Sequence, residues 1–197
     1  MWLVASYQPV ALFTLKVGTA TATEGKTLLV PTPFAIRTAL LDVAIRLGGE
    51  RNGRAAFDLL RTLDIAVAPP AYAVVTNLFA RILKPTRGDK ESDEAMTRTI
   101  AFREYVHYTG TLSLAFGGEE GALRPLAGWL AHLTYLGRRG GFFQFLPPPA
   151  WHEPPGYPDG FTRLTQAAGE SFPLGVLQLL DDWGPSLTYE KVNVFAG

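Results

Sequence analysis

The segment from Tyr105 to Phe116 alternates between apolar and polar side chains more regularly than any other part of the chain. One face carries apolar or aromatic residues: Val106, Tyr108, Leu112, Leu114 and Phe116. The other face carries mostly polar ones: Tyr105, His107, Thr109, Thr111 and Ser113. This period of two predicts a strand in a sheet that has one face packed on a core and the other face open.

Helix and strand patterns follow one another through the first 146 residues. Strand character recurs in residues 12–17, 71–83 and 142–146, the last ended by prolines 147–149. Helices are expected from Thr32-Pro33 to Gly48-Gly49, over residues 53–63, and after Glu119-Glu120. The order strand, helix, strand, strand, helix, strand predicts an α+β fold of the ferredoxin-like (RRM-like, split βαβ) class.

The chain divides by composition into two parts. We expect a ferredoxin-like domain over residues 10–146 and a C-terminal appendage over 147–197 that ends in a strand at 187–195. Residues 1–146 hold 16 Lys/Arg and 12 Asp/Glu, whereas residues 147–197 hold 2 and 6. The split is equally consistent with chance and with a basic surface on the first part.

Composition excludes several classes of protein. The formal net charge is zero, which argues against nucleic-acid binding by bulk charge alone. Without cysteine the chain has no disulfide, thiolate zinc site or thiol nucleophile. The segment that ends in Gly25-Lys26-Thr27 has six residues between its glycines where a P-loop needs four. We therefore expect no metal and no cofactor. No apolar window can span a membrane, so we expect a cytoplasmic protein.

A glycine-rich turn with two arginines follows the expected second main helix. It comprises Gly137, Arg138, Arg139, Gly140 and Gly141. Glycine backbone and guanidinium donors suit phosphate, although such a turn is equally compatible with a solvated loop. Further basic residues precede it, including Lys84, Arg87 and Arg103, and Tyr105 on the open sheet face is placed to stack a base.

His107 lies beside Tyr105 on the polar face of the same strand. This pair is the one place where the sequence suggests acid–base catalysis on a ribose hydroxyl. Pairs of this kind also occur on sheets without any catalytic role, so both interpretations remain open.

Several segments together resemble the CRISPR-associated RAMP superfamily, and most closely the handle-binding subunit of Cascade-type (type I) surveillance complexes. The matching segments are Leu12–Lys16, Leu28–Arg37, Phe102–Val106 and Tyr135–Gln144. They span roughly residues 10–146 and leave the remainder unmatched.

The resemblance implies a non-catalytic subunit of a ribonucleoprotein complex in antiviral defence. Such a subunit holds the 5′ handle of the guide RNA (crRNA), caps the filament of backbone subunits and docks the large subunit close to target DNA. By matching position, residues 137–141 contact the handle, and residues 84–103 correspond to a thumb that packs over the guide. Arg37, one turn into the first helix, is a further candidate for phosphate contact.

Two other functions remain open. Some relatives cut the repeat RNA without metal by means of a Tyr, a Lys and a His, and here Tyr105 and His107 have no lysine nearby in sequence. The other alternative is a scaffold subunit that binds protein alone, which the zero net charge permits.

Overall fold

The central layer of the molecule is a five-stranded antiparallel sheet. The computed structural model describes residues 1–18, 25–85, 96–138, 140–153, 156–165 and 177–192. The strands of this sheet are β1 (Trp2–Pro9), β2 (Asp64–Ala68), β5 (Leu112–Gly117), β6 (Phe143–His152) and β7 (Thr162–Arg163). Their spatial order is β6-β1-β5-β2-β7.

The first four of these strands and two helices give a βαββαβ unit. Helix α1 (Pro33–Thr62) joins β1 to β2, and α2 (Glu120–Leu130) joins β5 to β6. In space the fourth strand of the unit lies beside the first, followed by the third and the second. This arrangement confirms the expected α+β, ferredoxin-like class.

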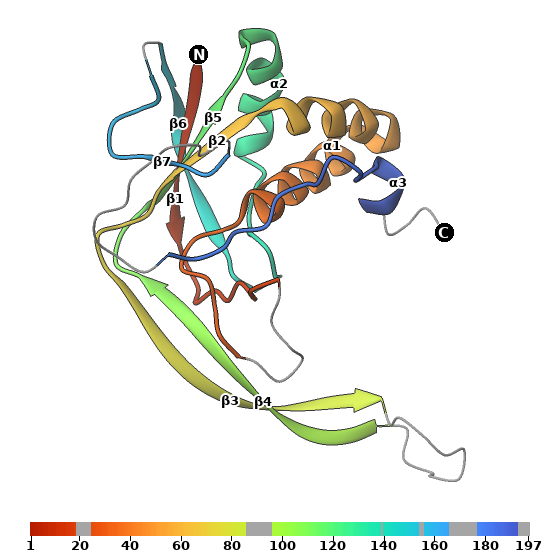
Figure 1. The fold of residues 1–197 in the computed structure, drawn as a ribbon, viewed down its shortest axis with the longest axis vertical. Helices are drawn as coiled ribbons and strands as arrows, with labels where there is room; N and C mark the ends of the chain where they lie inside the picture. Colours follow the sequence, from red (N-terminus) through yellow and green to blue (C-terminus); the bar gives the residue numbers. More distant parts are fainter. Residues whose placement is uncertain (19–24, 86–95, 139, 154–155, 166–176, 193–197) are drawn as a thin grey trace.

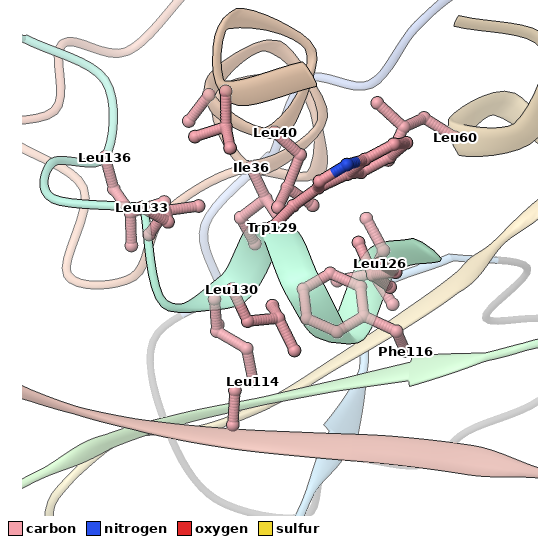
Figure 2. Close-up of a cluster of buried hydrophobic side chains, with 14 of the residues drawn as sticks. Ile36, Leu40, Leu60, Leu114, Phe116, Leu126, Trp129, Leu130, Leu133 and Leu136 are labelled. Carbon is pink, nitrogen blue, oxygen red and sulfur yellow. The ribbon is translucent and has the colours of Figure 1, made fainter. Parts of the chain in front are cut away.

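Both helices cover the same face of the sheet (Figure 1). In Figure 2, Leu114 and Phe116 of β5 point toward α2, and Trp129 lies between α2 and α1. Leu114 and Phe116 are fully buried there. Each fully buried side chain of this size contributes about 2 kcal/mol through the hydrophobic effect, so this layer is the main source of stability.

Helix α1 begins where the sequence predicts. Thr32 is the N-cap, and its hydroxyl accepts a hydrogen bond from the backbone N–H of Ala35 at 3.0 Å. Pro33 occupies the first helical position, where no N–H is required. The expected break is a kink at Gly49, whose φ of 72° is outside the helical region, and the helix continues beyond it to Thr62.

The prediction of a first strand at residues 12–17 is wrong, because the first strand of the sheet is β1. Residues 12–17 make only isolated bridges, from Phe13 to Val106 and from Lys16 to Thr27. The sheet therefore draws on residues before position 10, and β6 extends it beyond 146.

The alternating run at 105–116 forms parts of two strands rather than one. A bend at Thr109 and Gly110 separates β4 (Met96–Tyr108) from β5. All five apolar residues of the run are nevertheless buried, as expected. Strand β4 pairs with β3 (Ala73–Pro85) in a second, two-stranded sheet, which we call the arm. The arm curves away from the helices and the main sheet (Figure 1), and its two strands run to Pro85 and from Met96.

The prolines at 147–149 do not end β6. They lie where the register between β1 and β6 shifts, between the pairs Ser6–Leu146 and Val4–Ala150. Because β6 is an edge strand with a local irregularity, prolines that lack an N–H are tolerated there.

Residues 177–192, which we call the strap, run along α1 (Figure 1). Trp183 stacks on Phe57 of α1 with ring centroids 4.7 Å apart. Residues 189–192 form the short helix α3 (Tyr189–Val192) rather than the strand expected there, while residues 193–195 lie outside the described part. Aromatic packing on α1 holds this segment in place. In the sequence, an apolar alternation looks the same whether the segment packs on a helix or pairs in a sheet.

Candidate nucleic-acid interface

A groove of about 450 Å³ lies where the arm meets the rest of the molecule. Its walls come from five places: the arm, residues 14–16 with 25–26, the start of α1, the turn at 137–138, and the strap. None of the five belongs to a strand of the main sheet. The groove is large enough for a small ligand or a single nucleotide.

Four cations line this groove. They are Lys16, Lys26, Arg103 and Arg138. Asp181 is the one acid among the described residues of the lining. A concave surface with this charge balance attracts anions such as the phosphates of a nucleic-acid chain.

The arm presents Arg103 and Tyr105 to the groove through the alternation of β4. Its residues 101, 103 and 105 share one face, together with Ala80 and Ile82 of β3, and all of them line the groove. Glu104 points to the opposite face, where its carboxylate accepts a hydrogen bond from the backbone N–H of Thr27 at 3.0 Å. Strand β4 thus directs Arg103 into the groove, and Glu104 on its other face fixes the strand to the backbone of Thr27.

Tyr105 lies on the arm, so the expectation that it occupies the open face of the main sheet is wrong. That face carries Ser6 and Ser113, whose hydroxyls lie 2.8 Å apart, and it is partly covered where Tyr157 packs on Trp2. The bend after Tyr108 separates Tyr105 from the main sheet. Its ring reaches the groove instead, where an aromatic face is suited to stacking on a base.

The glycine-rich turn packs closely against its own chain. A Cβ atom on Gly137 would lie 2.5 Å from a methyl carbon of Leu15, and one on Gly141 would lie 2.8 Å from Cβ of Phe13. Gly137 also has a φ of 74°, which disfavours any other residue. Two of the glycines therefore permit close packing on residues 13–15, and this packing presents the exposed Arg138 at the groove.

A second hollow, of about 260 Å³, lies next to the groove. The two share Thr14, Tyr105 and Arg138, and the second also includes Gly140 and Gly141. Together they form a continuous path past the Tyr105 ring and the Arg138 guanidinium. Two adjoining hollows suit consecutive nucleotides of a polymer better than one small ligand.

Most of the predicted binding residues come together at this path: Arg103, Tyr105, Gly137, Arg138, Gly140 and Gly141. Arg87 and Arg139 lie outside the described residues. Lys84 is in β3, paired with Thr97 near the far end of the arm. The structure describes the position of Lys84 on the arm and not its side chain.

Arg37 is placed differently from the expectation that it contacts phosphate. Its side chain is 4% exposed and forms an ion pair with Asp182 at 2.7 Å. It also donates to the backbone carbonyls of Leu60 and Leu63. Because these contacts hold the guanidinium inside the protein, Arg37 does not line the groove.

His107 is exposed on the same face of β4 as Tyr105 but does not line the groove. Lys16 and Lys26, which the sequence did not single out, do line it. Little in the sequence indicates these two lysines as binding residues, because both flank a small polar segment without periodicity. The structure thus brings lysines to Tyr105 and leaves the histidine outside.

The base of the arm is fixed by a buried tyrosine. The Tyr108 hydroxyl donates to the backbone carbonyl of Leu29, just before α1. Burial raises the pKa of Tyr108 well above its usual value, so this donor stays protonated at neutral pH. The contact couples the arm to the start of α1, and both are walls of the groove.

The described residues contain no group of three or more His, Cys, Asp or Glu side chains arranged to hold a metal ion. Their helices include none that is long and apolar enough to cross a membrane.

No family model and no curated protein matches the chain. Among the solved structures that are similar to it, two have a TM-score of 0.49 each. One is described as a CRISPR RNA-guided surveillance complex, with 19% identity over 72% of this chain and 59% of the other. The second is described as Type III-B Cmr-beta bound to cognate target RNA, with 12% identity over 74% of this chain and 58% of the other. The chain thus spans less than two thirds of the length of either, and the fold assignment above rests on the strand order itself.

Proposed function

We propose that this protein is a guide-RNA-binding, non-catalytic subunit of a CRISPR effector complex, and that the groove holds the 5′ handle of the guide. The observation that carries the proposal is the convergence of four cations and Tyr105 in one groove. The motif resemblance points the same way, because the turn at 137–141 and the segment 102–106 both border this groove.

The groove supplies both of the interactions that single-stranded RNA requires. Lysine and arginine side chains neutralise phosphates without regard to sequence, and an aromatic ring stacks on an unpaired base. Arg138 and Tyr105 border both hollows, so a chain that follows the path passes a guanidinium and a ring in succession. Capping of the backbone filament and docking of the large subunit belong to the same proposal and rest on the resemblance.

The test is RNA binding by the full chain, measured alone and in the assembled complex. We expect Arg138→Ala to weaken binding of a single-stranded handle RNA about fivefold. We also expect it to reduce the slope of log affinity against log salt by about 0.7, because one phosphate contact is lost. Arg124→Ala is the matched control, since Arg124 pairs with Glu120 on the outside of α2 and does not line the groove.

Equal affinities of Arg138→Ala and Arg124→Ala would contradict this site. If neither the isolated protein nor the complex contacts RNA through this chain, the protein-only scaffold is the better description. RNA recovered from the same incubations, run with EDTA on a denaturing gel, addresses the nuclease alternative. Cleavage that His107→Ala abolishes would replace the non-catalytic role.

A further inference from the structure

We propose that Asp181 selects a guanine at one position of the bound RNA by accepting hydrogen bonds from the Watson–Crick edge of that base. The proposal rests on the function proposed above, because it concerns the same groove. Its starting point is that Asp181 brings a negative charge into a lining with four cations.

The strap holds Asp181 at a fixed place in the groove wall. Its backbone carbonyl accepts a hydrogen bond from the N–H of Phe34, in the first turn of α1, at 3.0 Å. The next residue, Asp182, is bound by the buried Arg37 through two contacts of 2.7 and 3.1 Å. Asp182 also accepts from the backbone N–H of Trp183 at 2.7 Å. The backbone at Asp181 and at the residue that follows it is therefore anchored.

The Asp181 carboxylate itself is available. Within the described residues, no hydrogen bond or ion pair engages it. It lies against Gly18, where an added Cβ atom would overlap the carboxylate, so the backbone approaches closely on that side. The free side of the carboxylate faces the groove, which it lines.

A carboxylate in this position weakens phosphate binding, so its favourable contact must be with a hydrogen-bond donor. An ionised carboxylate accepts hydrogen bonds through two oxygens and donates none. Guanine offers two adjacent donors on its Watson–Crick edge, N1–H and the N2 amino group. Adenine and cytosine each offer one amino group next to an acceptor, and uracil offers one N–H between two carbonyls. Guanine is thus the base that satisfies both oxygens.

Two aromatic rings in the same groove are placed to receive the base. Phe34, which is 40% exposed, is joined to Asp181 through the backbone hydrogen bond, and Tyr105 lines the arm side. A base that stacks on either ring presents its edge toward the groove wall. The neighbouring lysines and arginines then bind the flanking phosphates.

The experiment measures binding of the full chain to short oligouridines that carry one central guanosine, inosine or adenosine. Inosine is the informative probe, because it lacks only the N2 amino group. We expect the wild-type protein to bind the guanosine oligomer about tenfold more tightly than the inosine one. Asp181→Asn should abolish that difference, because the amide replaces one acceptor with a donor. Asp58→Asn, on the exposed side of α1, makes the same change in net charge and should retain it.

Each outcome decides the proposal. Uniformly tighter binding by Asp181→Asn, without any guanosine preference in the wild type, would mean that the carboxylate acts by charge alone and would overturn it. A preference for adenosine would do the same. RNA binding that lacks base preference leaves the proposed function intact, whereas no binding to any oligomer refutes both. Thermal unfolding of both variants confirms that they are folded.

Discussion

Arg37 shows how one residue can carry the right chemistry for one role and serve another. At the sequence level it is a cation one turn into a helix, which is a common position for a phosphate ligand. In the structure its guanidinium is covered by the strap and paired with Asp182, 145 residues later. Nothing local in the sequence reports a partner so distant. Lys16, Lys26 and Asp181 likewise stand in segments without a local pattern and reach the groove through the fold, whereas Tyr105 and Arg138 were singled out because they stand in recognisable motifs.

Removal of Arg37 should destabilise the fold far more than removal of a surface arginine. Arg37→Ala leaves two backbone carbonyls and the partly exposed Asp182 without their donor, and we expect a loss of about 3 kcal/mol in the free energy of unfolding. Arg124→Ala breaks an exposed ion pair between residues one helical turn apart and should lower the free energy of unfolding by about 0.5 kcal/mol or less. Denaturant titration of both variants measures the difference, and similar midpoints would disprove a structural role for Arg37.

Among the elements, those with strong local signals were predicted and those defined by their neighbours were not. The N-cap Thr32 was predicted, and the helix end predicted at Gly48-Gly49 falls at the kink, because capping and glycine backbone freedom act within a few residues. Strand β2 was missed, since its five residues follow α1 directly. Strand β6 was cut short at its prolines, although an edge position tolerates them. Strand pairing is a long-range property, so a short or irregular strand has little signature of its own.

Two glycines in different surroundings should respond in opposite ways to replacement by alanine. Gly137→Ala places a methyl group against Leu15 at a positive φ, and we expect a loss of about 2 kcal/mol in stability. Gly128 lies inside α2, exposed and with nothing within 4 Å of an added Cβ, so Gly128→Ala should gain roughly 0.5–1 kcal/mol from helix propensity. Thermal unfolding of the two variants distinguishes them, and a stabilised Gly137→Ala would contradict the close packing of the turn.

At the scale of the whole molecule, two buried tyrosines connect parts that are far apart. The Tyr7 hydroxyl donates to the backbone carbonyl of Leu130 at 2.9 Å and joins β1 to the end of α2. Tyr108 joins the arm to the segment before α1. The ferredoxin-like order was predicted from the sequence, but the angle between arm and sheet was not, because it depends on contacts of this kind.

Stability should fall in alkaline solution as these two hydroxyls ionise on unfolding. Burial raises the pKa of both tyrosines above their ordinary value of 10.0. A group whose pKa is raised in the folded state stabilises the fold fully below its unfolded pKa and loses that contribution as the pH rises. Above pH 10.0 we therefore expect a decline of about 1.4 kcal/mol per pH unit for each tyrosine. Urea titrations at several pH values measure the decline, and Tyr108→Phe should make it less steep. A slope equal to that of the wild type would rule out Tyr108 as a contributor.

The place of β1 between β6 and β5 has a consequence for how the protein is made. Ribosomes deliver the chain from its N-terminal side, yet Ser6 of β1 meets Ser113 of β5, which comes 107 positions later in the sequence, and β6 is translated later still. Strand β1 therefore waits, with both hydrogen-bonding edges unsatisfied, until β5 and β6 have been synthesised. Nascent chains of this topology need protection from premature strand pairing, whether by a chaperone or by rapid translation.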